Sequence, residues 1–395
     1  MSDNFNSNNY LLIKNVEKTK NFFIFKRSNK NIKKLFSSSN EINPNDNIKK
    51  PIYRLLDYVS LAKIFAAFSV VILHTNHNFW KFYYAFYKNY WISANVIECV
   101  FYFAVPVFVL CIGATLLDFN EKYGLKKYYR RRIFKVVIPL LSWNAILYFY
   151  RVYFLKNFPK RKISFAYLWN LYYNHKIYFI FGSFHQFLLV YMAIPLVAYV
   201  EKSNKIKIYS YYFILLFITQ SLIPYIIKVF HLPLVWVYGR NLEFIIYIFP
   251  GYIIQNYKFS RLYRYIIYIL GLFGLLIHLL GTQILTLRYR RLIQLHKGYL
   301  NMPCILYSCS VFLFIKENAY LLFKIINRKY INKIGSLTIG PFFLHLPLLD
   351  TFDKYIKIDT FSLNYRLYGG IFACAICLII TAILKKILLF NYILP

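Results

Sequence analysis

The sequence predicts an all-α polytopic membrane protein, a bundle of about ten transmembrane helices. Three observations support this fold class. Hydrophobic residues make up 59% of the 395-residue chain, and aromatic residues make up 21%. Charged residues make up only 16%, whereas a soluble domain carries about 25%. The apolar residues also form long blocks that can cross a bilayer, so the core of the protein should form between helices.

The chain is strongly basic. It has 49 Lys and Arg against 14 Asp and Glu, which gives a formal net charge of +35. In a soluble domain this excess would favour a nucleic-acid partner. Here the basic residues lie mainly in tails and loops between apolar blocks. This pattern favours a lipid bilayer with anionic headgroups and phosphate-bearing ligands, and it argues against nucleic acid.

Most of the six cysteines lie within apolar runs. Cys374 and Cys377 have C-x-x-C spacing, but on a helix in lipid this spacing is typical of packing rather than of redox or zinc chemistry. We therefore expect no metal site.

Residues 1–50 are rich in Asn, Ser and Lys and contain no long apolar block. The short run at 22–25, FFIF, is too brief for the apolar region of a signal peptide. We expect a basic, disordered cytoplasmic tail here, followed by one membrane domain over residues 51–395.

The apolar blocks predict ten helices in order. They cover 57–75, 97–117, 133–150, 184–200, 208–227, 241–256, 264–282, 300–316, 335–350 and 367–390. The mixed segment 151–183 predicts a lumen-side or re-entrant loop. Ten spans place both termini on one side, and the Lys and Arg of the loops on that side predict that it is cytoplasmic. Two opposite loops, 151–162 and 286–297, are also basic, so charge alone leaves the topology open.

The first predicted helix holds two ionisable residues, Lys63 and His74, within an apolar block. Eleven residues turn a helix through about 1100°, so both side chains share one stripe, about 16 Å apart along the axis. Ionisable groups in a membrane helix usually face the bundle interior and mark a functional site. In the alternative interpretation, Lys63 reaches the headgroups and His74 marks the end of the helix.

A basic segment leads into the third predicted helix. It includes Arg130, Arg131, Arg132 and Lys135. Arginine suits bidentate contacts to phosphate, and the N-terminus of a helix favours anions. The segment predicts a phosphate site, although flanking charges that set the topology have the same pattern.

Four motifs, in this order, resemble the acyltransferase-3 family of membrane O-acyltransferases. The first helix of that family carries Arg or Lys, ten residues and then His, as Lys63 and His74 do here. Three further segments of this sequence resemble motifs of the family. They are VPVFVLCIGATLL from residue 105, YYRRRIFKVVIPLLSW from residue 128 and IGSLTIGPFFLHLPLL from residue 334. Two positions depart from the family pattern, because Ser60 stands in place of Asp and Ile112 in place of Ser.

The resemblance implies transfer of an acyl group, with acetyl as the default, from acyl-CoA to a hydroxyl of a cell-surface polysaccharide or its lipid-linked precursor. Acetyl-CoA would be the donor co-substrate, with its phosphates on the basic segment. His74 would act as general base, and Lys63 would bind phosphate or stabilise developing negative charge. His345 is a second catalytic candidate, with a hydrogen-bonded helix-end His as its structural alternative.

Other interpretations stay open at this point. Glu243 either pairs with Arg240 or Lys63, or faces water at the membrane interface. Intramembrane charges would also suit a transporter or flippase of a polyanionic or lipid-linked glycan. A glycan polymerase would favour a larger outward loop than 151–183. In each case we expect a multi-pass protein of the plasma membrane or of a bacterial inner membrane.

Overall fold

The structure is a computed structural model that describes residues 57–158, 164–232, 243–356 and 358–394. Within these ranges the regular structure is helical and contains no strand, which confirms the predicted all-α class. All of the described residues belong to one unit, Ile52–Pro395. Residues 1–50, predicted to be a disordered tail, lie outside the described residues.

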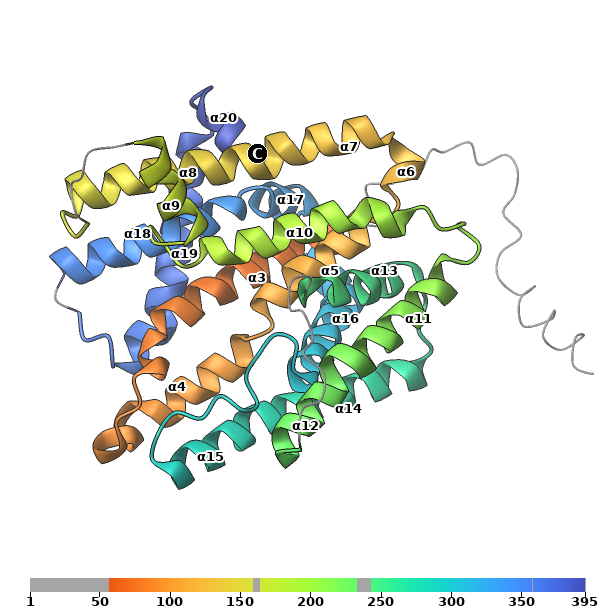
Figure 1. Cartoon of the computed structure of the whole chain (residues 1–395), viewed down its shortest axis with the longest axis horizontal. Helices are drawn as coiled ribbons and strands as arrows, with labels where there is room; N and C mark the ends of the chain where they lie inside the picture. The colour runs from red at the N-terminus through yellow and green to blue at the C-terminus, as the bar shows by residue number, and fades with distance from the viewer. Residues whose placement is uncertain (1–56, 159–163, 233–242, 357, 395) are drawn as a thin grey trace, which may run out of the picture. The chain divides into compact units, whose positions relative to one another are not determined.

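Long helices follow one another along the chain and are joined by short connections (Figure 1). The α-helices are α3 (Asp57–Thr75), α4 (Tyr87–Phe101), α5 (Ala104–Leu116), α6 (Phe119–Lys122), α7 (Leu125–Arg132), α8 (Ile138–Phe149), α9 (Phe165–Tyr173), α10 (Phe181–Ala198), α11 (Lys205–Leu216), α12 (Ile223–Phe230), α13 (Ile248–Asn256), α14 (Arg261–Leu276), α15 (Thr282–Tyr289), α16 (Met302–Ile325), α17 (Arg328–Gly335), α18 (Ile339–Tyr355), α19 (Gly370–Leu384) and α20 (Phe390–Ile393).

Short 3₁₀ or π segments extend or join several of these helices. They are η2 (His77–Trp80), η3 (Tyr84–Phe86), η4 (Ile133–Val137), η5 (Tyr150–Phe154), η6 (Phe217–Leu222), η7 (Glu243–Tyr247), η8 (Ile277–Gly281) and η9 (Tyr365–Gly369).

Eight helical segments among the described residues are long and apolar enough to cross a membrane, judged by length and composition. They are Asp57–Thr75, Tyr84–Leu116, Leu125–Phe154, Phe181–Ala198, Lys205–Phe230, Arg261–Tyr289, Met302–Ile325 and Tyr365–Leu384. This finding supports the predicted multi-pass membrane bundle. The side of the membrane on which each terminus lies stays a prediction.

Two of the ten predicted spans are not among these eight segments. The block at 241–256 forms η7 and α13, a short apolar helix over Phe244–Asn256. The block at 335–350 ends α17 and begins α18. α18 has 17 residues and carries Asp350, Asp353 and Lys354 in its last two turns. A helix of that length with three charges at one end is poorly suited to cross a bilayer alone.

α3 lies at the centre of the bundle (Figure 1) and packs against α4, α5, α16, α17, α18 and α19. Glycines allow two of these helices to approach closely. A Cβ atom added at Gly370 would lie 2.8 Å from the Ile72 side chain, and one added at Gly335 would lie 2.7 Å from the Ser60 Cβ. Larger side chains there would push α19 or α17 away from α3.

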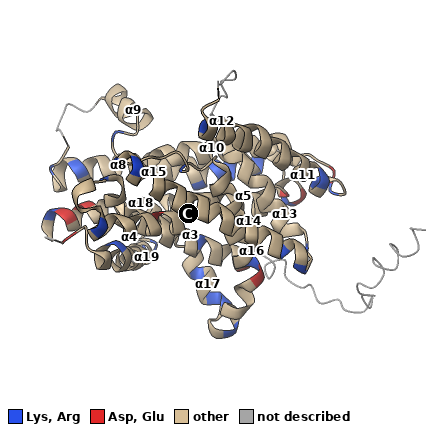
Figure 2. Ribbon diagram, turned by 90° about the horizontal axis from the view of Figure 1, so that it is seen from below, with Lys and Arg blue, Asp and Glu red and all other residues tan. Residues whose placement is uncertain are grey.

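The outer helices expose large apolar side chains. Ile269 and Phe273 of α14 are 66% and 53% exposed, and Phe372 and Ile379 of α19 are 64% and 60% exposed. Basic side chains occur mainly near the ends of helices and along the short α17 (Figure 2). Apolar surfaces of this kind are stable when lipid tails cover them.

Candidate active site

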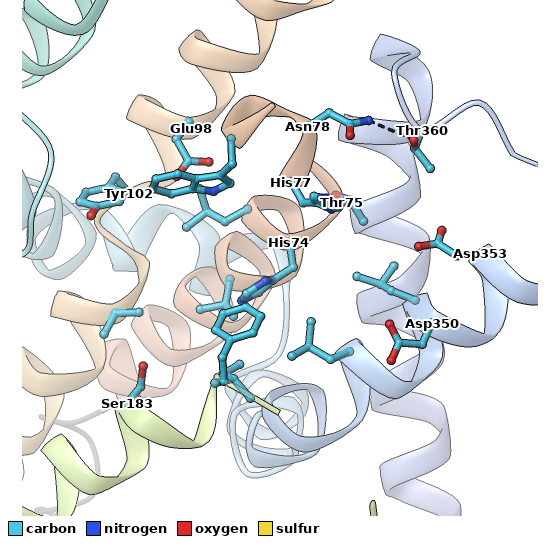
Figure 3. A pocket seen from close by; sticks show the side chains of 18 of the residues that line it. His74, Thr75, His77, Asn78, Glu98, Tyr102, Ser183, Asp350, Asp353 and Thr360 are labelled. Carbon is cyan, nitrogen blue, oxygen red and sulfur yellow. Dashed lines mark hydrogen bonds between the residues drawn. The ribbon is translucent and has the colours of Figure 1, made fainter. Parts of the chain in front are cut away.

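A cavity of about 740 Å³ lies at the C-terminal end of α3. Its lining includes His74 of α3, His77 of η2, Glu98 of α4, Ser183 of α10 and Asp350 of α18, which surround one space in Figure 3. Ligand sites commonly have volumes of about 300–1,000 Å³, so this cavity is large enough for a sugar unit or an acyl chain.

His74 lines this cavity, and His345 packs beside it. Their ring centroids are 4.7 Å apart, and the ring planes are inclined by 42°. His74 lines the cavity and also packs on the Phe179 ring, with the centroids 5.6 Å apart. His345 is fully buried on α18. The two predicted catalytic histidines are therefore neighbours in space, although one lies near the beginning and the other near the end of the domain in the sequence.

A hydrogen bond determines which nitrogen of His345 carries the proton. Nδ1 lies 2.6 Å from the carbonyl oxygen of Pro341, one turn earlier on α18. A carbonyl oxygen can only accept, so Nδ1–H donates, and in the neutral ring Nε2 presents a lone pair. Nε2 is buried and has no hydrogen-bond partner within the described part of the chain. This nitrogen can accept a hydrogen bond from a donor that reaches it.

Three carboxylates also line the cavity: Glu98, Asp350 and Asp353 (Figure 3). The Tyr178 hydroxyl donates a hydrogen bond of 2.7 Å to Asp350 and so orients its carboxylate. Asp353 lies within electrostatic range of His77 and of the Lys81 ammonium. The wall contributed by α18 therefore offers mainly hydrogen-bond acceptors to a bound group.

His77 lies just beyond the last turn of α3, in η2. Burial lowers the pKa of His77 below its usual range, and the Lys81 ammonium lowers it further, whereas Asp353 acts in the opposite direction. A lowered pKa keeps most of the imidazole neutral near pH 7. His77 is thus a further group at this cavity that can accept a proton.

Glu98 forms a buried ion pair with Lys297 of the loop between α15 and α16. The Lys297 ammonium lies 3.2 Å from a Glu98 oxygen, and the two side chains are 2% and 3% exposed. The ammonium also lies 4.0 Å from the centre of the Phe79 ring and 4.7 Å from that of Tyr102. Carboxylate and aromatic faces together compensate for the loss of water around this cation.

A second buried cation fixes the end of α3. Arg366 is 1% exposed and donates from Nη2 to Ser93 Oγ at 2.8 Å and from Nη1 to Asn76 Oδ1 at 3.4 Å. Asn76 in turn donates to the Ala94 carbonyl at 2.9 Å and to Glu98 at 3.5 Å. Because Asn76 follows His74 by two residues, this network positions the C-terminal end of α3 that carries His74.

The basic group, defined as Lys63, Arg131, Arg132 and Lys135, lies nearer the other end of α3. Lys135 is within electrostatic range of the other three cations. None of the four forms a salt bridge with an acidic residue of the described ranges. Four positive charges without an acidic partner repel one another, so an anion bound among them would be stabilised.

Arg132 gives this group its most specific feature. Its guanidinium lies 5.2 Å from the centre of the Tyr191 ring and 5.6 Å from that of Tyr128. Arg132 Nε is buried and has no hydrogen-bond partner among the residues described. A buried donor without an acceptor is costly, and a phosphate oxygen would satisfy it.

The structure divides the predicted site residues between two places. His74 lines the cavity with His345 packed against it, whereas Lys63 is not part of the lining and belongs to the basic group. One stripe on α3 therefore serves two sites, about 16 Å apart along the axis. Arg130 is exposed on α7, and its role in phosphate binding stays a prediction.

The predicted partners of Glu243 cannot be compared, because Arg240 and the Glu243 side chain lie outside the described residues. The two cysteines with C-x-x-C spacing, Cys374 and Cys377, are buried on α19, in agreement with a packing role.

Sequence reasoning did not single out Glu98, Asp350, Asp353 or His77. The signal that could have identified the acids is their scarcity, because the chain has only 14 acidic residues. Two of them, Asp350 and Asp353, follow His345 by five and eight residues, at the end of its predicted helix and just beyond it. Glu98 had no such signal, since its partner Lys297 is remote in sequence.

The described residues form a helix bundle with segments able to cross a membrane, in which His74 and His77 line an internal cavity and His345 packs against His74. The family model described as the Acyltransferase domain of acyltransferase family 3 matches residues 56–385. The chain therefore belongs to this family and is an acyltransferase, which confirms the resemblance drawn from the four motifs. No curated protein matched the chain, and no solved structure did.

Proposed function

We propose that this protein transfers an acetyl group from acetyl-CoA to a hydroxyl of a cell-surface polysaccharide or of its lipid-linked precursor, in the plasma membrane or a bacterial inner membrane. The observation that carries the proposal is His74, which lines a cavity of about 740 Å³ and packs against the buried His345 ring, with centroids 4.7 Å apart. Neutral imidazole is suited to remove a proton from a hydroxyl near pH 7.

The donor would bind with its phosphates on the basic group. Coenzyme A carries a diphosphate and a 3′-phosphate, and Arg132 Nε is a buried donor without a partner among the described residues. Lys63 adds a second cation on α3 itself. The pantetheine arm is an extended chain, so the phosphates and the thioester need not lie at the same end of α3. Placing the basic group on the cytoplasmic side would give it access to cellular acetyl-CoA.

The chemical step is direct transfer. The acceptor hydroxyl oxygen attacks the thioester carbonyl carbon while His74 takes the hydroxyl proton. The carbon–sulfur bond then breaks, and the proton passes to the leaving thiolate, which gives an ester and free coenzyme A. His345 Nε2, a buried lone pair beside His74, could accept the same proton or hold the His74 ring in place.

The alternative of a transporter or flippase has less support. Both alternatives use intramembrane charges, but the chain belongs to an acyltransferase family, and a flippase has no need for paired neutral imidazoles.

Turnover of radiolabelled acetyl-CoA by the purified protein tests the proposal. We expect free coenzyme A and labelled ester in equal amounts when extracted lipid-linked glycan is added, and mass spectrometry should find acetyl esters on surface glycan only in cells that contain the protein. His231→Ala is the matched control, because His231 is exposed at the end of α12, away from the cavity. Coenzyme A release without ester formation, or transfer from a different acyl donor alone, would refute it.

A further inference from the structure

The two ends of α3 differ in charge. Of the chain's 14 acidic residues, Glu98, Asp350 and Asp353 line the cavity around His74. Of its 49 Lys and Arg, Lys81 alone is found in that lining as far as the described residues show. Lys297 neutralises Glu98, so the excess negative charge of the lining comes from Asp350 and Asp353 against Lys81. In a chain with a net charge of +35, this cavity therefore has a small negative excess.

An unpartnered amide oxygen extends this pattern. Asn78 is 2% exposed and lines the cavity, and its Nδ2 donates a hydrogen bond of 3.0 Å to Thr360 Oγ1 (Figure 3). Asn78 Oδ1 is buried and has no hydrogen-bond partner among the described residues. A carbonyl oxygen accepts hydrogen bonds only, so a hydroxyl or N–H donor of a bound molecule would satisfy it.

We propose that this cavity binds the reacting unit of the acceptor as a neutral or cationic group rich in hydrogen-bond donors, and that it rejects units bearing carboxylate or phosphate. This inference rests on the proposed function for the identity of the acceptor as a glycan. Hydroxyl and ammonium groups satisfy Asn78 Oδ1 and the carboxylates together, whereas an anion brings only acceptors and like charge.

The opposite signs of charge at the two ends of α3 also keep the two substrates apart. The polyanionic donor is attracted to the basic group and repelled by the carboxylates of the cavity. The acceptor, free of negative charge, gains nothing from the basic group. The thioester arm alone would reach the imidazoles, and coenzyme A would leave by the end at which its phosphates were held.

The sign of the charge in the cavity can be measured without knowing the acceptor. Ser183→Cys places a thiol in the lining with little change in size. In purified protein we expect the trimethylammonium-ethyl methanethiosulfonate to label this thiol at least tenfold faster than the sulfonatoethyl reagent, after correction for their rates with free thiol. Changing both Asp350→Asn and Asp353→Asn should reduce that preference severalfold.

Two controls make this labelling decisive. Gly124→Cys adds a thiol to the exposed basic segment before α7, where the anionic reagent should react faster. The unaltered chain gives the background from its own cysteines, most of which are buried. Equal or faster labelling of Ser183→Cys by the anionic reagent would overturn the proposal.

Acceptor selectivity is tested with octyl glucoside, octyl glucosaminide and octyl glucuronide. We expect kcat/KM for the glucuronide to be at least tenfold lower than for the glucoside, and the difference should shrink in the double Asn variant. Equal transfer to the glucuronide would refute the charge selection. Transfer to none of the three, with cation-selective labelling intact, would count against the proposed function while supporting the charge of the cavity.

Discussion

Replacing Glu98 by Gln should destabilise the fold more than most single changes, because it leaves Lys297 buried without its counterion. The ammonium lies 3.2 Å from the carboxylate, and the side chains of Lys297 and Glu98 are 2% and 3% exposed. Removing one partner of a buried pair costs about 3–5 kcal/mol. The Phe79 and Tyr102 rings would retain part of the stabilisation, about 0.5–2 kcal/mol, so we expect a net loss toward the lower end of that range.

An unfolding titration in mixed micelles measures the effect. The matched control is Lys202→Ala, which removes an ion pair of 2.8 Å to Glu121 that is largely exposed. Water and salt screen that pair, so the change should be far smaller. The combination of Glu98→Gln with Lys297→Met removes both charges, and it should be more stable than Glu98→Gln alone because no unpaired charge remains.

Two results would refute this reasoning. One is a loss of stability for Glu98→Gln no larger than that of Lys202→Ala. The other is additivity of the two changes at Glu98 and Lys297, because residues that share a buried pair should show a coupling energy. Glu98→Gln should also lower the transfer rate at temperatures where the fold survives, since Glu98 bonds Asn76 near His74.

Further predictions concern catalysis, donor binding, topology and pH. His74→Ala should reduce kcat by about 10²–10⁴ if this ring takes the proton, and near-normal transfer by a monodisperse variant would make His74 structural. Arg132→Ala should raise the KM for acetyl-CoA about tenfold, with a smaller effect on kcat; an unchanged KM would return the residue to a role in topology. A cysteine at Gly124 should resist an impermeant reagent added to intact cells if the segment is cytoplasmic, and labelling from outside would reverse the topology. Because the pKa of His77 is lowered in the fold, the unfolded chain binds its proton more readily. The free energy of unfolding should therefore fall as pH drops below about 6.5 and level off below the folded pKa; His77→Gln should flatten this dependence, and an identical pH profile for the variant would contradict it.

The sequence by itself determined the class of fold and the family. Apolar blocks, basic loops and four ordered motifs are local patterns, so they survive without knowledge of how the helices pack. The special character of α3 was also recognisable from the sequence alone, because ionisable residues such as Lys63 and His74 are unusual in a membrane helix. The approximate bounds of most helices followed from the apolar blocks. Two blocks proved shorter than a span, because a run of apolar residues does not reveal where a helix breaks.

Only the tertiary structure decided which residues form a site. His345 reaches His74 because α18 packs on α3, and Lys297 reaches Glu98 because a loop folds back onto α4. Packing also placed Lys63 and His74, which share one helical stripe, in different surroundings, because only His74 lines the cavity. Helical periodicity specifies the direction of a side chain on its own helix, but its neighbours depend on contacts between helices remote in sequence. Those contacts bring the carboxylates of α4 and α18 to one cavity. The overall basic composition of the chain gave no indication of this grouping.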